Sequence, residues 1–117
     1  MTLRRINPGR RMSAASIHEG VVRLAGQIAE DPSKDVTAQT EEVLATIDAL
    51  LHEAGSSKHR ILSAQIFLAN MGDFDKMNVA WDAWVSQSDP PPRATVEARL
   101  ASPACLVEIV VTAAQTA

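Results

Sequence analysis

Aromatic residues and cysteine are scarce in this sequence. The 117 residues include no tyrosine, two tryptophans, two phenylalanines and one cysteine, Cys105. A single cysteine excludes a disulfide within the chain and any metal site built from several cysteines. Proteins that bind single-stranded nucleic acid stack the bases on aromatic side chains, and four aromatic residues offer little for such a surface.

Positive charge is limited as well. Lysine and arginine number 11 against 14 aspartates and glutamates, which gives a net charge of -3. The longest basic runs are the pairs Arg4-Arg5 and Arg10-Arg11. Domains that bind nucleic acid usually carry a broad basic face, so we expect no nucleic-acid partner.

Long hydrophobic runs are missing too. No window approaches the roughly 20 apolar residues of a membrane-spanning helix, and the first residues lack the apolar stretch of a signal peptide. The length fits one domain, and the composition of 46% hydrophobic and 21% charged residues is typical of globular proteins. We therefore expect a single domain over residues 1–117, no membrane partner and, with one free cysteine, a cytoplasmic location.

The hydrophobic patterns predict an α+β fold. Alternation and short apolar runs predict strands over residues 13–19, 21–28, 61–69, 93–100 and 106–113, with a weaker indication at residues 2–6. Three- and four-residue spacing predicts helices over residues 36–54, with Asp35 as N-cap, and over residues 73–85. The resulting order is β-β-α-β-α-β-β. Two helices cover only one face of such a sheet, so the other face meets solvent or another subunit.

Glycine marks two positions in the first pair of strands. Glu19-Gly20 is a hairpin-turn signal between two apolar runs. Gly26 lies inside a predicted strand, where glycine indicates either a packing or bulge position or a close approach to the backbone, including approach by a ligand. The pattern leaves both interpretations open.

Arg93 and Glu108 are the candidate functional side chains. Arg93 begins a strand directly after the rigid segment Pro90-Pro91-Pro92, and its planar guanidinium suits two-point binding of a carboxylate. The pattern alone favours a structural ion pair for this arginine. Glu108 interrupts an otherwise apolar strand, and it lies either at a solvated edge or in a pocket.

Metal-binding patterns are missing. His18, His52 and His59 lie on different predicted elements, and none has a partner at metal-ligand spacing. We expect no metal site.

Taken together, these segments resemble the YjgF/RidA family. The resemblance rests on Ala25-Gly26-Gln27-Ile28, Ala54-Gly55, Asp73-Phe74 with Asn78, Pro92 through Leu100, and Val107-Glu108-Ile109. These segments follow in order across nearly the whole chain. The stretch from Pro92 to Leu100 is the most specific part.

The resemblance implies a fold, an assembly and an activity. The fold is one mixed sheet backed by two helices on one face, in a chorismate-mutase-like arrangement, and it assembles as a homotrimer with ligand sites in clefts between subunits. Active members hydrolyse reactive enamines and imines, of the 2-iminobutanoate and 2-iminopropanoate type, to 2-oxo acids and ammonia. They need no cofactor.

The resemblance also assigns roles to residues. Arg93 matches the arginine that binds the substrate carboxylate, and Glu108 matches the glutamate that places or activates the attacking water. Gly26 matches a glycine whose backbone lines the pocket, and Asn78 matches a helix residue near the site. Thr95 occupies a position that is often cysteine in the family.

Three departures favour a second hypothesis. Besides Thr95, the chain has Ala25 where a serine is common, and it has no counterpart of a tyrosine near the N-terminus, where Met12 falls closest. The alternative is therefore a non-catalytic trimeric protein that binds a small carboxylate or acts as a regulator. Ribonuclease activity, sometimes ascribed to relatives, is disfavoured by the acidic balance and the few aromatic residues.

Overall fold

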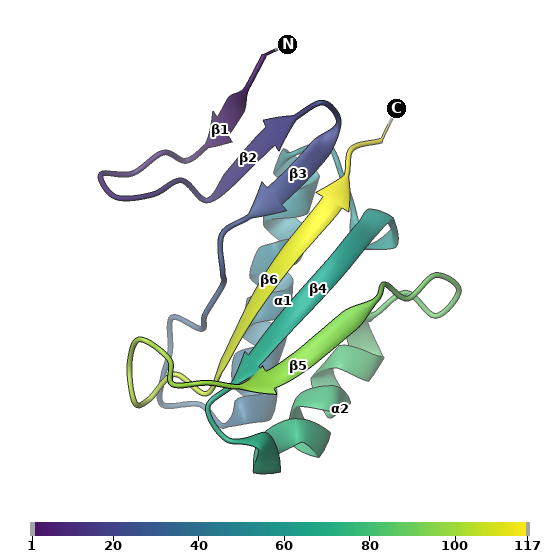
Figure 1. Ribbon diagram of the computed structural model, residues 1–117. Coiled ribbons are helices and arrows are strands. Elements are labelled where there is room, and N and C mark those ends of the chain that lie inside the picture. The colour runs from purple at the N-terminus through teal and green to yellow at the C-terminus, as the bar shows by residue number, and fades with distance from the viewer. Residues whose placement is uncertain (1, 117) are drawn as a thin grey trace.

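The computed structural model describes residues 2–116 and contains one six-stranded sheet with two helices on one face (Figure 1). The strands are β1 (Arg4–Ile6), β2 (Ala15–His18), β3 (Val21–Leu24), β4 (Ile61–Leu68), β5 (Arg93–Glu97) and β6 (Val107–Ala114). The helices are α1 (Val36–Glu53) and α2 (Phe74–Trp84), with short 3-10 turns at Lys58–Arg60 and Met71–Asp73. The predicted α+β class and element order are confirmed, including the weakly indicated first strand.

The sheet is mixed. Its strand order is β1-β2-β3-β6-β4-β5, and β4 and β5 pair in parallel whereas the other neighbouring strands pair antiparallel. The parallel pair is connected through α2, as a parallel connection requires a crossover. β1 and β5 form the two edges of the sheet (Figure 1).

Helix α1 begins and ends where the sequence predicts. The carboxylate of Asp35 accepts a hydrogen bond from the backbone N–H of Ala38 at 2.9 Å, which satisfies one of the free donors of the first turn. Gly55 follows the last turn with φ of 77°, a left-handed conformation that glycine adopts without strain. The buried stripe consists of Val36, Gln39, Thr40, Val43, Leu44, Ile47, Leu50 and Leu51.

The β2–β3 hairpin turns through Glu19 and Gly20, whose φ angles are 52° and 78°. Two successive positive φ values are typical of the two-residue type I′ turn, so the predicted hairpin is confirmed. β3 ends at Leu24, four residues earlier than predicted. Gln27 then forms an isolated bridge with Ile109, with N···O distances of 2.9 and 3.1 Å.

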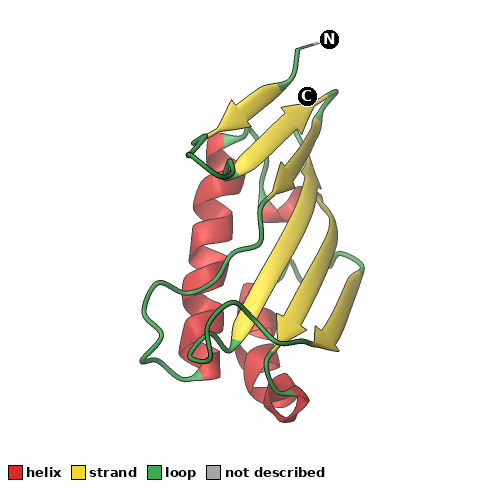
Figure 2. Ribbon diagram, turned by 60° about the vertical axis from the view of Figure 1, so that its left-hand side comes forward, coloured by secondary structure: helices red, strands yellow, loops and turns green. Residues whose placement is uncertain are grey.

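The two faces of the sheet differ. On β4, the side chains of Ala64, Ile66 and Leu68 are buried beneath the helices, and those of Gln65 and Phe67 alternate with them on the opposite, open face. Figure 2 shows both helices on one side of the sheet. The buried apolar residues form one continuous cluster between these layers. Within residues 2–116, no helix combines the length and the hydropathy that crossing a membrane requires.

Candidate functional site

Arg93 lies on the face of the sheet that the helices cover. Its register partner on β4 is the buried Ala64, so its side chain points toward α2. The guanidinium carbon lies 5.1 Å from the ring centroid of Trp81 and 5.7 Å from that of Phe74. Its Nη1 donates a hydrogen bond to Oδ1 of Asn78 at 2.7 Å. One helix therefore supplies both the aromatic contacts and the amide that orient this guanidinium.

Spacing on α2 explains this arrangement. Phe74, Asn78 and Trp81 are separated by four and three residues, so they lie on the same face of the helix. Phe74 and Trp81 were not among the site residues that the sequence indicated. Trp81 is indeed buried in the core, but its ring also contacts the arginine. We call Arg93, Asn78, Phe74 and Trp81 the arginine group.

The guanidinium of Arg93 has no ionic partner within residues 2–116, where the ion pairs are His18–Glu19 and Lys34–Glu42. Burial lowers the pKa of Arg93, and the charge of Asp82 opposes that effect. A guanidinium keeps its charge in proteins despite such a shift. The structural ion pair that the sequence pattern favoured is therefore not observed among the described residues. A partly buried cation without a carboxylate partner can bind an external anion.

Thr95 lies on the same face as Arg93, since its register partner is the buried Ile66. Its hydroxyl oxygen is buried and has no hydrogen-bond partner among the described residues.

The backbone N–H of Thr95 points in a different direction from its hydroxyl. At the two ends of β5, the carbonyl of Pro92 accepts from the N–H of Ala64 at 3.0 Å and the N–H of Ala98 donates to the carbonyl of Leu68 at 2.9 Å. The even-numbered residues therefore pair with β4. The N–H of Thr95 therefore points away from β4, along the free edge of the sheet.

Glu108 and Gly26 form a second group, which we call the glutamate group. Glu108 is half-buried on β6, and its register partner is Phe67 on the open face. A Cβ built on Gly26 would overlap the carboxylate of Glu108. The close approach to Gly26 is thus made by a side chain of the same chain. Any larger residue at position 26 would therefore force the Glu108 carboxylate to move.

The two groups lie on opposite faces of the sheet. Arg93 faces α2, and Glu108 faces away from both helices. Among the five site residues indicated by the sequence, the fold joins Arg93 with Asn78 and Gly26 with Glu108, and Thr95 lies beside Arg93. A single chain does not bring Arg93 and Glu108 together.

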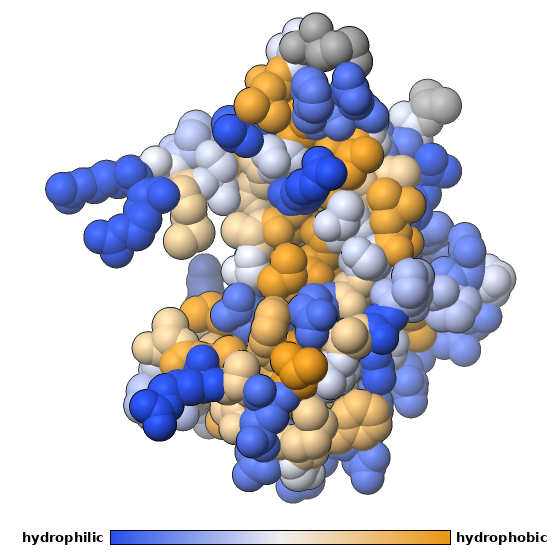
Figure 3. Space-filling view, viewed as in Figure 1, coloured by the Kyte–Doolittle hydropathy of each residue, from blue (hydrophilic) through white to orange (hydrophobic). Residues whose placement is uncertain are grey.

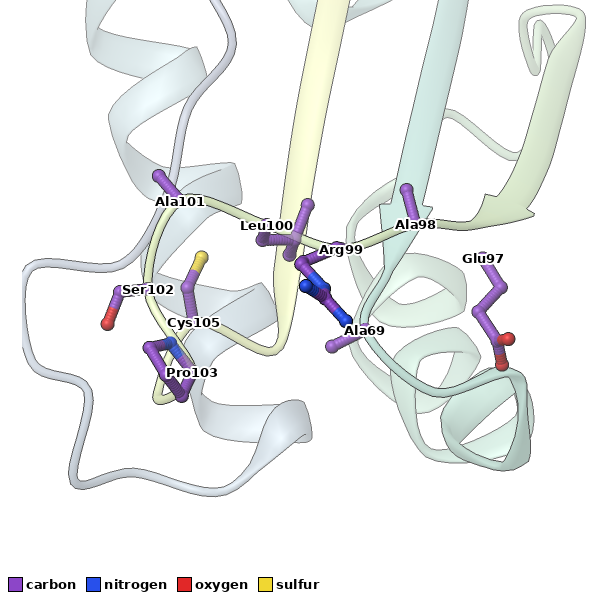
Figure 4. A pocket seen from close by; sticks show the side chains of 9 residues that line it. All are labelled: Ala69, Glu97, Ala98, Arg99, Leu100, Ala101, Ser102, Pro103 and Cys105. Carbon is purple, nitrogen blue, oxygen red and sulfur yellow. The ribbon is translucent and has the colours of Figure 1, made fainter.

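A separate hollow lies at the end of β5, away from both groups. It measures about 700 Å³ and is lined mainly by the segment that follows β5, with Arg99, Pro103 and Cys105 (Figure 4). Glu97, at its rim, accepts a hydrogen bond from the N–H of Met71 at 2.8 Å. Neither Arg93 nor Glu108 lines this hollow. Among residues 2–116, no three His, Cys, Asp or Glu side chains converge as they would around a metal ion.

Comparison with a family model places this arrangement among known proteins. The model described as Endoribonuclease L-PSP matches residues 2–115, almost the whole chain. A RutC family protein of Haemophilus influenzae is 51% identical over 114 residues, which cover 97% of this chain and 98% of that protein. The RutC family protein YoaB of Escherichia coli is 45% identical over 114 residues, covering 97% and 99%.

Solved structures agree with the sequence comparison. NMB1025 of Neisseria meningitidis, described as a member of the YjgF protein family, superposes with a TM-score of 0.97 at 43% identity, covering 100% of this chain and 98% of that one. The likeness extends over every strand and helix described above.

Proposed function

Since this chain belongs to the YjgF/RidA family, we propose that it hydrolyses small enamines and imines that carry a carboxylate, giving 2-oxo acids and ammonia. The observation that supports this proposal most directly is Arg93. Its guanidinium is held by Asn78 and two aromatic rings and lacks an ionic partner within residues 2–116. A substrate carboxylate would supply that partner.

The substrate carboxylate would bind to the N–H donors of Arg93 that Asn78 leaves free. A guanidinium has five N–H donors, and Asn78 takes one of them at Nη1. The others can bind both oxygens of a carboxylate, and the outward N–H of Thr95 adds a further donor at the same edge. Fixing the carboxylate fixes the imine carbon relative to the protein. Such positioning is the main requirement, because a protonated imine is already electrophilic.

The chemical step needs a base near the bound water. Water attacks the carbon of the protonated imine, and Glu108 accepts the proton that the water releases. Glu108 then returns the proton to the nitrogen of the tetrahedral intermediate. As the carbon–nitrogen bond breaks, the hydroxyl group becomes the carbonyl and its proton passes to Glu108 and from there to the departing ammonia. An enamine first takes a proton on carbon and becomes the same imine. Gly26 leaves the space that the Glu108 carboxylate occupies.

The cleft is shared between subunits in this proposal. Arg93 and Glu108 lie on opposite faces of one sheet, so one substrate can meet both only if they come from different copies. A homotrimer provides three such clefts and also covers the open face that the helices leave bare.

The first test is hydrolysis of imines generated in situ by an amino-acid oxidase, with 2-oxo acid formation as the readout. Arg93→Ala should lose about 100-fold in kcat/KM, because the imine is no longer positioned. Arg93→Lys keeps the charge but not the planar fork and should recover only part of the activity. Arg60→Ala, an exposed arginine on the turn before β4, serves as the matched control. Equal activity in Arg93→Ala and the parent would refute the assignment.

Two features of the site favour binding without turnover as the second candidate. The hydroxyl of Thr95 is buried under the strand and not directed along the free edge, and Ala25 supplies no hydroxyl beside Gly26. The site then has few groups besides Glu108 that can orient water. Thermal-shift titration with 2-oxo acids separates the two candidates. Stabilisation that Arg93→Ala abolishes, without imine hydrolysis by the parent, selects the binding protein.

A further inference from the structure

A groove runs between α1 and α2 on the outer side of the helix layer. The hydroxyl of Thr37 on α1 donates a hydrogen bond to the carbonyl of Lys76 on α2 at 2.8 Å. Further along both helices, the indole N–H of Trp84 donates to Oδ2 of Asp48, also at 2.8 Å. Between these two connections the helices leave a hollow of about 250 Å³, which we call the helix groove.

The helix groove lies on the other side of the molecule from the open face of the sheet. Figure 3 views the open face, where hydrophobic side chains are exposed along the middle of the sheet. That face carries Glu108 and is the one that the proposed trimer covers. The lining of the helix groove includes no member of the arginine group or the glutamate group. A trimer formed through the open face therefore leaves this groove accessible.

Three half-buried side chains carry polar groups in the helix groove, namely Asp48, Lys58 and Trp84. The ammonium of Lys58 donates to the carbonyl of Trp84 at 2.7 Å and lies 5.5 Å from the centroid of its ring. The indole in turn donates to Asp48, so Trp84 orients both charged groups. Within residues 2–116, neither Asp48 nor Lys58 forms an ion pair. The ammonium retains two donors, and the carboxylate retains its second oxygen.

The rest of the lining determines what kind of ligand fits. It consists of the exposed Glu41 and of four apolar residues, Leu44, Ala45, Ala80 and Ala83. A ligand that pairs with both half-buried charges carries an ammonium group for Asp48 and a carboxylate for Lys58. It also needs an aliphatic part to cover the apolar residues. The hollow is smaller than the roughly 300–1,000 Å³ of pockets for drug-sized ligands, and an internal peptide segment lacks both charged groups.

We propose that the helix groove binds a free amino acid with a small aliphatic side chain. Asp48 binds its ammonium group, and Lys58 binds its carboxylate. The aliphatic side chain lies against Ala45, Ala80 and Ala83. The site is independent of the proposed hydrolysis, because it shares no residue with the groups that carry that proposal.

Titration of the intact protein with L-valine, followed by NMR of the indole N–H signals of its two tryptophans, tests the proposal. The Trp84 signal should move, because its N–H donates to Asp48 in the groove. The Trp81 signal should move less, because that ring is buried against Arg93. A 2-oxo acid bound at Arg93 should give the opposite pattern. A Trp84 signal that stays in place during the valine titration would overturn the groove as the site.

Charge substitutions test the two ionic contacts. Asp48→Asn keeps an acceptor for the indole N–H but loses the charge, and it should weaken valine binding about tenfold. Lys58→Gln should weaken binding by a similar factor. The matched controls are Asp75→Asn and Lys76→Gln, at exposed positions of α2 outside the groove lining, and each should change binding less than about twofold. Equal weakening by the controls would replace the site with general charge attraction.

Two analogues of valine test the assignment of its charged groups. Isobutylamine lacks the carboxylate and isovalerate lacks the ammonium, so each should bind about tenfold more weakly than valine. Isobutylamine that binds as tightly as valine would contradict the role of Lys58. Arg93→Ala should bind valine as the parent does. Loss of valine binding in Arg93→Ala would place the amino acid in the proposed substrate cleft and overturn the groove site.

Discussion

Nη1 of Arg93 donates to Oδ1 of Asn78 at 2.7 Å, and no acid within residues 2–116 forms an ion pair with this arginine. The partner is neutral although the donor is charged. An amide orients the guanidinium without neutralising it, so the attraction for an external carboxylate is retained. A carboxylate at position 78 would compete with that ligand.

Substitution of Asn78 tests this relationship. Asn78→Ala removes the orienting hydrogen bond and should raise KM about fivefold, since one bond to a charged group is lost. Asn78→Asp retains the geometry but gives Arg93 an internal carboxylate, and it should weaken carboxylate binding more, by about tenfold or greater. Both are measured as KM for imine hydrolysis or as the midpoint of a 2-oxo acid titration. Tighter binding by Asn78→Asp than by Asn78→Ala would contradict the argument.

Gly26 and Glu108 should behave as a coupled pair. Gly26→Ala places a methyl group where the Glu108 carboxylate lies, so the side chain must rotate away. Activity should fall about as far as in Glu108→Ala, roughly 100-fold, because the base is misplaced. The double variant Gly26→Ala/Glu108→Ala should be no worse than either single variant. A double variant whose losses multiply would show that Gly26 acts by another route.

Stability measurements complete this test. Gly26 has no positive φ in the structure, so alanine brings no backbone strain. The unfolding free energy of Gly26→Ala should therefore stay within about 1 kcal/mol of the parent, because a flexible side chain absorbs the clash. A large loss of stability would attribute the fall in activity to the fold and not to the position of Glu108.

The sequence predicted the elements better than their mutual placement. Periodicity and turn residues set the helices and the hairpin, because such signals are local in the chain. The alternation of a strand puts Arg93 and Thr95 on one face, but it does not say which face the helices cover. The packing of α2 against β4 decides that face. The aromatic contacts of Arg93 and its separation from Glu108 could therefore not be predicted from the sequence.

Gln39 shows a further limit of pattern reading, since this polar residue lies within the buried stripe of α1 and is itself fully buried. Its amide nitrogen donates to the carbonyls of Lys34 and Ala104 at 3.0 and 3.1 Å, and its oxygen accepts from the N–H of Leu106 at 3.0 Å. The side chain thus ties the segment before β6 to the start of α1. No local signal in the sequence indicates such a connection over 65 residues.

Gln39→Leu should therefore destabilise the protein despite its similar size. Three partly buried hydrogen bonds to the backbone are lost, which should lower the free energy of unfolding by about 3 kcal/mol. The matched control is Gln87→Leu, an exposed glutamine that also donates to two backbone carbonyls and should change stability by about 0.5 kcal/mol. Urea denaturation measures both. Similar values for the two variants would show that the buried connection contributes little.

Cys105 should make stability depend on pH. Burial raises the pKa of its thiol, and the backbone hydrogen bond to Val107 partly opposes this. The folded protein therefore keeps the proton at pH values where the unfolded thiol, with a pKa of about 8.5, has lost it. Stability is complete below that value and declines as pH rises toward the folded pKa. The difference in unfolding free energy between the parent and Cys105→Ala should shrink from pH 7 to pH 9.5, and a constant difference would contradict the burial effect.

Mixed oligomers test whether the arginine and glutamate groups meet across a subunit boundary. Arg93→Ala and Glu108→Ala should each be inactive as pure proteins. Unfolding and refolding an equimolar mixture forms mixed oligomers. In the proposed trimer, some clefts would then combine an intact Arg93 from one copy with an intact Glu108 from the next. If each cleft takes these residues from different copies, about a quarter of the clefts are restored by random assembly.

The control is the same mixture made without refolding, in which subunits have not exchanged and activity should stay at the level of the pure variants. Activity that returns after refolding assigns the two residues of one cleft to different subunits. Refolded mixtures that form trimers of the expected mass but remain inactive would mean that each cleft draws both residues from one chain. Since Arg93 and Glu108 face opposite sides of the sheet, that result would also require a different fold around the site from the one described here.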